Sequence, residues 1–572
     1  MVRSISNRMN KILCVFAFVF AVIATAVAAD IKITTSLSDG DKISGVVTLK
    51  VTVTSEATVN NVEFYVNNRL RGTDSSTPYT LTLDTVTEKE GPLEVEIGVY
   101  TSAGDQKKMK LKLVVDNGLN KGAKFHTDNA VKFLQVSKWD DAIQACRIAL
   151  KADESFVPAK LAMSRAFLGK AVYDEAQKWG EDAMLSGESP EVLELLSGIH
   201  ANRAFVILSM SGDKGDALKE IAKAMKASII MRHKSLDMQI KALGAVTDAN
   251  RLQIVDLYIK KNDYSPARRL LREKYKNTDP DLAIANRLIF AEMRSGRMVD
   301  AYKVTEEIQK YSAPDGTTWG LIAAGQAYYR QYDKSSEALR NATLSGDESP
   351  SLMTAAAFLA LRKNDRSAMG SQITQMLRKA PSDAEVFYYI STLQYMTGQR
   401  LEAFRNFRNT LASNPLLYDA YVQRGYEALY SSSTAAETGA AADKDLLIEQ
   451  AKQYMELALV AKPDSAEALN GLAIVYLLQN KVVDAVSMAE AAVRAGSEYP
   501  WAWFTYSSAL DKSNTSNDPI TRNKISKLSN DACQTAGKLD KSTLAGRNIP
   551  TPMEAWRYSA ENARIPTLIP PK

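Results

Sequence analysis

A small residue recurs at intervals of 34 positions through most of the chain, and this spacing constrains the fold more than any other feature. Several successive differences are 34, while three longer ones of 41, 50 and 48 imply inserts of 7, 16 and 14 residues. Because each repeat buries the apolar face that its neighbour leaves open, such a period predicts a repeat array and not one compact core. The positions in phase are Ala142, Ala176, Ala217, Ala267, Ala301, Ser335, Met369, Ala403, Ala451 and Ala485.

This period and the residues around it resemble the tetratricopeptide-repeat (TPR) family, whose unit is 34 residues long. A second small residue follows seven positions later, as at Ala149, Ala183 and Ala492, and a closing proline appears at Pro381 and Pro415. The resemblance covers residues 119–540 and implies an all-α solenoid, a right-handed superhelix of about ten helix pairs. The residues that depart from the family pattern are Lys274, Ile308 and Met369.

The inserts and the end of the array have different compositions. Residues 431–443 are rich in Ser, Thr, Ala and Gly, which predicts an exposed loop. Residues 228–243 are apolar at helical spacing, which predicts a helix packed on the array. The unit from Trp501 to Ala536 has a polar composition typical of a cap, and the proline-containing residues 541–572 predict an extended tail.

Residues 30–117 have a different period, because apolar and polar residues alternate one by one. Val47, Leu49 and Val51 alternate with threonine and lysine, as in a strand with one buried face. Six or seven such runs, separated by turns such as Ser38-Asp39-Gly40-Asp41, predict a two-sheet β-sandwich.

The sandwich segment resembles the bacterial immunoglobulin-like domains of exported proteins. The resemblance depends on Val62-Glu63-Phe64-Tyr65-Val66-Asn67, on Thr77-Pro78-Tyr79 and on Asp84. It implies a spacer or adhesion module. Alternating lysines on the last predicted strand are either a basic patch or a solvated face that resists edge pairing, and edge protection favours the second reading. They are Lys107, Lys108, Lys110 and Lys112.

Residues 1–29 have the three parts of a secretory signal: basic Arg3, Arg8 and Lys11, an apolar run over 12–23, and small residues up to Ala29. The apolar run is shorter than the roughly 20 residues that span a bilayer, so cleavage after Ala28 or Ala29 is favoured over a retained anchor. No later stretch approaches a membrane span. We therefore expect a periplasmic or secreted protein.

Removal of that segment lowers the formal net charge from +5 to +2, because residues 1–29 contain three bases and no acid. So small a surplus does not favour nucleic acid as a partner. The two cysteines that remain, Cys146 and Cys533, lie in segments at opposite ends of the array, and buried thiols are a simpler interpretation than a disulfide.

No motif for catalysis, cofactor binding or metal binding stands out. Ser211-Gly212-Asp213-Lys214 matches a Ser-x-x-Lys pattern, but its glycine and aspartate are typical of a turn between two helices. The three histidines, His126, His200 and His233, are far apart in the chain and lack the spacing of metal ligands. We expect no cofactor and no enzymatic activity.

The TPR resemblance implies that certain positions of each first helix line a concave groove. Aromatic and amide groups can bury an extended peptide and hold its backbone. The other interpretation is that these rings pack between repeats, which is the commoner role of a helix aromatic. The residues carried over are Tyr388, Tyr395, Tyr426, Asn470, Trp501 and Phe504.

The sequence therefore predicts an exported, non-catalytic scaffold or adaptor that binds a protein or peptide in the cell envelope. The alternative is a cell-surface or carbohydrate adhesion protein, with the sandwich as the binder and the repeats as a stalk. Exposed aromatics on a sandwich loop would favour that alternative, and Tyr65 and Tyr100 are the candidates. The identity of the partner and the oligomeric state do not follow from these residues.

Overall fold

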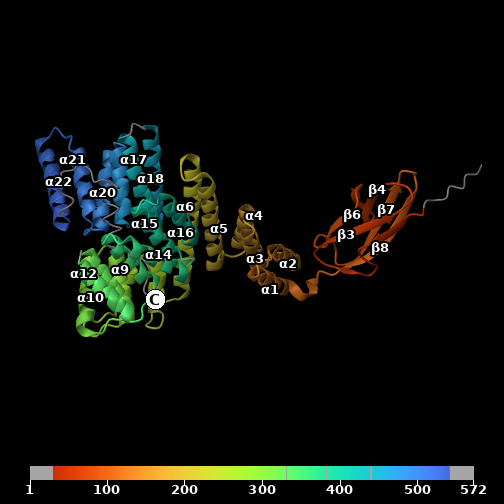
Figure 1. The fold of residues 1–572 in the computed structure, drawn as a ribbon, viewed down its shortest axis with the longest axis horizontal. Helices are drawn as coiled ribbons and strands as arrows, with labels where there is room; N and C mark the ends of the chain where they lie inside the picture. Colours follow the sequence, from red (N-terminus) through yellow and green to blue (C-terminus); the bar gives the residue numbers. More distant parts are fainter. Residues whose placement is uncertain (1–29, 330, 382, 438–440, 541–572) are drawn as a thin grey trace, which may run out of the picture. The chain divides into compact units, whose positions relative to one another are not determined.

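The computed structural model describes residues 30–329, 331–381, 383–437 and 441–540 (Figure 1). The chain divides into two compact units. Unit 1 comprises the described part of Met1–Lys132 together with Asp140–Phe156, and unit 2 comprises Phe133–Trp139 and the described part of Val157–Lys572. The expected signal segment, 1–29, and the expected tail, 541–572, lie outside the described residues.

Unit 1 is built on a β-sandwich of two sheets, with strand orders β1-β3-β6 and β2-β8-β7-β4-β5. All pairings are antiparallel except that of β2 with β8. The inward residues of the alternating runs, such as Leu49, Phe64 and Ile97, form its core. The strands are β1 (Lys32–Thr35), β2 (Lys42–Ile43), β3 (Val46–Thr54), β4 (Val59–Val66), β5 (Arg69–Asp74), β6 (Tyr79–Asp84), β7 (Gly91–Thr101) and β8 (Gln106–Val115).

The lysines of β8 are exposed. β2 pairs only with Val114 and Val115, so the part of β8 that carries the lysines has no strand partner on its outer side, as expected for an edge. Lys108 and Lys110 also form ion pairs of 2.7 Å with Glu96 and Glu94 of β7. These lysines therefore belong to a cross-strand ladder of opposite charges.

Unit 1 also contains most of the first helix pair, α1 (Gly122–Gln135) and α2 (Trp139–Ala152). Arg147 of α2 forms an ion pair with Asp84 at the end of β6, and Lys151 donates to the carbonyl oxygen of Glu88. The strand-to-helix change falls near residue 118, as expected. The compact unit, however, continues past it because α2 is bonded to the sandwich.

Twenty further helices, α3 to α22, follow in antiparallel pairs within unit 2 (Figure 1). Together with α1 and α2 they give eleven consecutive pairs among the described residues, which confirms the predicted solenoid of helix pairs. The helices are α3 (Val157–Gly169), α4 (Tyr173–Ser186), α5 (Pro190–Ser211), α6 (Gly215–Ala242), α7 (Arg251–Lys260), α8 (Tyr264–Arg272), α9 (Leu282–Arg294), α10 (Met298–Tyr311), α11 (Gly316–Tyr328), α12 (Tyr332–Leu344), α13 (Pro350–Arg362), α14 (Arg366–Lys379), α15 (Ala384–Met396), α16 (Arg400–Ser413), α17 (Tyr418–Glu437), α18 (Ala441–Ala461), α19 (Ala466–Leu478), α20 (Val482–Ala495), α21 (Pro500–Ser513) and α22 (Pro519–Leu539).

The recurring small residue lies where the two helices of a pair touch. Ala176, Ala301 and Ala485 are fully buried, although Ala217 is only half-buried. The helices approach so closely that Ser164 donates a 2.6 Å hydrogen bond to the carbonyl oxygen of Ala176, twelve residues later. Only a small side chain leaves room for this contact, so the period follows from packing.

The two inserts have different outcomes. Residues 228–242 are helical as expected, and they continue α6, which is 28 residues long. Residues 431–437 extend α17 and residues 441–443 begin α18, so most of the expected loop is helical; residues 438–440 lie outside the described residues. Apolar and alanine-rich content lengthens these helices beyond one repeat.

Among the described helices, α5 is long and apolar enough to cross a membrane by length and composition, which the sequence analysis did not anticipate. Its apolar residues have a different use, since Leu193, Leu196, Ala204 and Leu208 are buried. α5 packs against α4, α6 and α16. We therefore interpret it as a core helix of unit 2.

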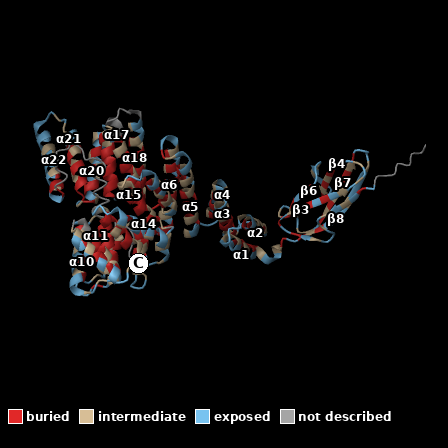
Figure 2. Ribbon diagram, viewed as in Figure 1, coloured by how far each residue is buried: buried red, intermediate tan, exposed pale blue. Residues whose placement is uncertain are grey.

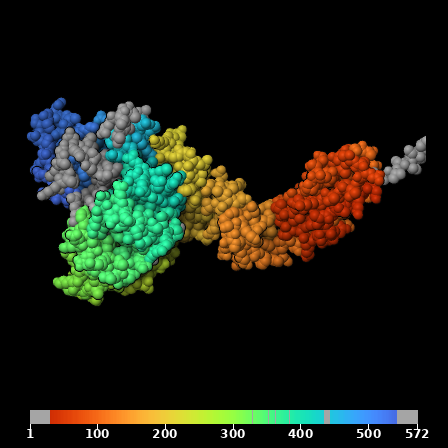
Figure 3. Space-filling model, viewed as in Figure 1, coloured from red at the N-terminus to blue at the C-terminus, as the bar shows by residue number. Residues whose placement is uncertain are grey.

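Unit 2 closes on itself, because helices far apart in the chain pack together. α5 contacts α16 and α6 contacts α18, and in Figure 3 the yellow surface of α5 and α6 lies directly against the cyan surface of α18. Buried residues are concentrated on α9, α15, α17 and α19, and red marks the ribbon around α15 and α17 in Figure 2. Unit 2 is therefore a folded body and not a simple open coil.

A buried carboxylate forms the first link of this closure. Asp213, in the turn between α5 and α6, accepts hydrogen bonds of 2.7 and 3.1 Å from Arg424 of α17. It also accepts one of 3.0 Å from the Tyr454 hydroxyl of α18. Burial opposes ionisation, but the Arg424 guanidinium and these hydrogen bonds keep the pKa of Asp213 below its usual value.

The second link is a buried bidentate ion pair. Arg294 at the end of α9 donates to both carboxylate oxygens of Asp419 at the start of α17, at 3.1 and 2.5 Å. The side chains are only 2% and 6% exposed. The guanidinium also lies 4.7 Å from the ring centre of Tyr418. Such a pair holds its two helices in one register, because separating the charges in a dry interior is costly.

We expect Arg294→Met to lower the free energy of unfolding by about 3–5 kcal/mol, because it leaves the Asp419 charge buried without its arginine. Chemical denaturation of residues 30–572, followed by circular dichroism, measures the change. The double variant Arg294→Met, Asp419→Leu should lose less. Arg494→Met, which removes an exposed ion pair with Glu490 on α20, is the control and should cost less than about 1 kcal/mol. Equal losses in the buried and exposed variants would contradict this role.

Candidate binding cavity

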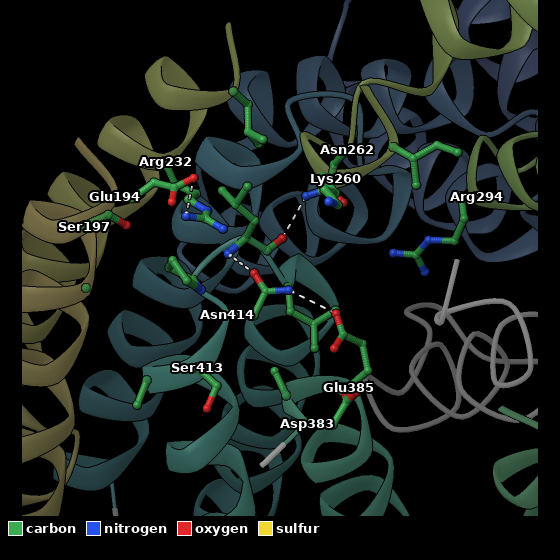
Figure 4. Close-up of a pocket in the computed structure, with 18 of the residues that line it drawn as sticks. Glu194, Ser197, Arg232, Lys260, Asn262, Arg294, Asp383, Glu385, Ser413 and Asn414 are labelled. Atoms are coloured by element: carbon green, nitrogen blue, oxygen red, sulfur yellow. Dashed lines mark hydrogen bonds and ion pairs between the residues drawn. The ribbon is translucent and has the colours of Figure 1, made fainter. Parts of the chain in front are cut away.

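A cavity of about 620 Å³ lies within unit 2, where α5 to α9 face α15, α16 and the segment that follows α16 (Figure 4). Its volume is within the roughly 300–1,000 Å³ that is typical of ligand pockets. The cavity exists because the two parts of the array close on each other, and no single repeat could form it.

A chain of hydrogen bonds joins the two sides of the cavity (Figure 4). The Asn414 amide donates to Glu385 Oε1 at 3.1 Å, and its oxygen accepts from the backbone N–H of Leu416 at 3.0 Å. The carbonyl oxygen of Leu416 accepts from the Asn262 amide at 2.8 Å. Asn262 lies in the turn between α7 and α8, so this chain connects that turn to the beginning of α15.

Charged groups line the cavity from both sides. Glu194 of α5 and Arg232 of α6 form an ion pair of 2.9 Å, and Arg294 is engaged with Asp419. Burial, together with the neighbouring Asp383 carboxylate, raises the pKa of Glu385 to about 7. Asp383 itself caps α15, since it accepts from the backbone N–H groups of Glu385 and Val386.

Apolar groups complete the lining. Tyr264 and Phe290, whose rings meet edge to face, and Leu236 come from one side, while Leu416 and Leu417 come from the other. A mixed lining of this kind suits a ligand with apolar surface and a few polar groups.

The structure places the predicted groove residues mainly inside the packing. Tyr388, Tyr426, Asn470, Trp501 and Phe504 are 7%, 0%, 0%, 5% and 6% exposed. Asn470 donates a 2.9 Å hydrogen bond to the Tyr426 hydroxyl. Because these side chains are buried, the interpretation that they pack between repeats is favoured. That they contact a peptide stays a prediction, and their burial does not support it.

The other pairings within this set are local. The Trp501 and Phe504 rings meet edge to face with centres 5.9 Å apart. Tyr395 is half-buried, with the Arg400 guanidinium 5.9 Å from its ring centre. None of the six predicted residues lines the 620 Å³ cavity.

The three histidines and the Ser211-Gly212-Asp213-Lys214 segment lie in contacts that belong to the packing of the protein. His126 is bonded to the carbonyl oxygen of Gly118 at 2.8 Å. Burial lowers the pKa of His200 and of His233. Ser211 ends α5, and Asp213 of the same motif is the buried partner of Arg424. Within the described ranges, no three His, Cys, Asp or Glu side chains gather closely enough to hold a metal ion.

Both cysteines of the described part are free thiols. Cys146 is buried as expected, and burial raises its pKa to about 12. Cys533 is only partly buried.

Sequence reasoning missed the residues that do line the cavity, among them Glu194, Arg232, Asn262, Glu385 and Asn414. Asp383 and Glu385 could have been noted as two acids at a helix start. Their position in a cavity depends on the closure between distant repeats, which the 34-residue period does not encode.

The raised pKa of Glu385 predicts a pH dependence of stability. Unfolded chains release this proton near the ordinary glutamate value of 4.5, and the folded protein releases it near 7. The folded state thus holds more protons between these values, so stability should fall as pH rises from 4.5 to 7 and then level off. Denaturation at several pH values measures this loss, which is about 3 kcal/mol.

Glu385→Gln should flatten this part of the curve, because it cannot ionise. Glu402→Gln, at an exposed position of α16, is the matched control and should keep the wild-type slope. An unchanged slope in Glu385→Gln would show that this carboxyl is not the group responsible.

Comparison with known proteins gives one family match: residues 31–97 match the family described as bacterial Ig domain. The DnaJ homolog subfamily C member 7 of Homo sapiens is 25% identical over 151 residues, which is 25% of this chain and 29% of that protein. The chain therefore spans less than a third of the length of this curated relative.

Among solved structures, the APC/C hetero-tetramer Cut9-Hcn1 contains a similar chain that is 11% identical in sequence. The alignment covers 74% of this chain and 84% of the chain in that structure, with a TM-score of 0.36. Yeast Tom70 is 15% identical in sequence, and the alignment covers 70% of this chain and 98% of the Tom70 chain, with a TM-score of 0.30. The assignment of the solenoid depends on the helix pairs of this chain, whose spacing and packing are described above. The chain thus carries an N-terminal segment that matches the bacterial Ig domain family, followed by a TPR-like helical solenoid.

Proposed function

We propose that the protein is an exported, non-catalytic scaffold or adaptor that binds a protein partner in the cell envelope through unit 2. The observation that carries this proposal is the closed array itself. Two buried ionic links, Asp213 with Arg424 and Arg294 with Asp419, fix the helices around a preformed cavity. A rigid, preformed surface binds with little ordering cost, which is the usual advantage of a solenoid scaffold.

The sandwich in this proposal is a positioning element or a second contact. Its bonds to α2 make it one compact unit with the first helix pair. The rival function, adhesion through the sandwich, would be supported by exposed aromatics on loops. Tyr65 and Tyr100 instead lie within β4 and β7 and are half-buried, and the Tyr65 hydroxyl donates a 2.7 Å hydrogen bond to Glu63. The observations therefore favour a protein partner of unit 2.

Cross-linking in the native cell, followed by mass spectrometry, tests this function with the full chain. We expect the cross-links to a partner protein to come from lysines of unit 2, such as Lys260, which lines the cavity, and Lys379 of α14. Cross-links confined to the sandwich, for example to Lys108, would favour the adhesion alternative. The absence of any protein cross-linked reproducibly to unit 2 would contradict the scaffold function.

Export has its own test. N-terminal sequencing of the protein from fractionated cells should give a chain that begins at Ala29 or Asp30, found in the envelope or the medium, because the small residues before them suit a signal peptidase. A chain that retains Met1 and lies in the cytoplasm would contradict export while leaving the binding function open.

A further inference from the structure

The end of the cavity next to α15 carries two carboxyl groups, Asp383 and Glu385, only two residues apart. The cationic groups of the lining do not neutralise them. Arg294 is engaged with Asp419 and Arg232 with Glu194, and among the described residues neither Asp383 nor Glu385 has an ion-pair partner. Two acids in a half-buried site without a counter-cation are unfavourable unless one of them holds a proton.

Glu385 shows the effect of this missing cation. Burial and the nearby Asp383 raise its pKa to about 7, so near neutral pH the carboxyl is protonated in a substantial fraction of molecules. Its one hydrogen bond from a described side chain is the 3.1 Å bond from the Asn414 amide. A proton thus occupies the place that a positively charged ligand group would take.

The remaining lining selects among cations. Ca²⁺ prefers six to eight oxygen ligands, and two carboxyls with one engaged amide do not provide them. The lining instead offers apolar surface from Tyr264, Phe290 and Leu416, against which an alkyl stem can pack. An apolar stem with a charged end describes the side chains of lysine and arginine.

Resting on the proposed function, we infer that the cavity receives a lysine or arginine side chain of an extended partner segment, whose charge pairs with Asp383 and Glu385. Entry of the cation displaces the proton of Glu385 to solvent. The other charged groups that face the site are Glu194, Arg232, Lys260 and Arg294. Lys260 lies on the opposite side, at the end of α7, and has no ion-pair partner among the described residues, so it provides a matched variant.

Isothermal titration of the mature chain with the peptide acetyl-Leu-Lys-Leu-amide tests the site, with acetyl-Leu-norleucine-Leu-amide as the uncharged probe. We expect the lysine peptide to bind at least tenfold more tightly. Because binding releases a proton, its affinity should rise about fivefold between pH 6 and 7 and about a further twofold above pH 7. Titrations in two buffers of different ionisation enthalpy measure the released proton.

Glu385→Gln should lose the preference for lysine and the pH dependence, while Lys260→Gln should keep both or bind the lysine peptide more tightly. Circular dichroism confirms that each variant is folded. Equal binding of the two peptides, no binding of either, or equal effects of the two substitutions would overturn the inference. Cross-linking of a protein partner to unit 2 could still succeed in that case, so failure of this site is distinguishable from failure of the scaffold function.

Discussion

The ion pair between Arg294 and Asp419 is the contact on which the shape of unit 2 depends. It joins two helices that are 125 residues apart in sequence, and both side chains are removed from water. Packing between neighbouring helices alone would allow a range of curvatures, because each repeat contacts mainly the next one. A buried bidentate pair permits one distance and one orientation, and therefore fixes how α9 and α17 lie against each other in unit 2.

The helix pairs and the sandwich could be predicted because their signals are local. The contact between two paired helices requires a small residue, so alanine recurs once in every repeat, as at Ala176 and Ala301. The inward face of a strand requires apolar residues, so these recur at every second position. Local signals also explain the errors. Residues 228–242 were correctly expected to be helical, but nothing within one repeat length shows that they continue the preceding helix as α6.

The candidate site could not be predicted in the same way. Asp213 lies in a turn whose sequence is ordinary, and its partner Arg424 follows 211 residues later. Tyr426 and Asn470 were candidates for a groove or for the packing between repeats, and both are fully buried, with the Asn470 amide donating to the Tyr426 hydroxyl. The residues that line the cavity come from helices that are not neighbours in the chain, so they share no period from which they could be inferred.

The serine hydroxyls that link the two helices of a pair have a consequence for recognising such repeats. In two pairs the donor stands on the first helix, where Ser164 and Ser391 bond to the carbonyl oxygens of Ala176 and Ala403. In a third pair the direction is reversed, since Ser335 of the second helix donates to Ala323 of the first. At the position where the two helices of a pair touch, serine can therefore stand on the first helix and alanine on the second, or the reverse. A search profile that demands alanine at one fixed column will overlook units in which the two residues have exchanged places, and divergent members of such arrays are better found by scoring the pair of columns together.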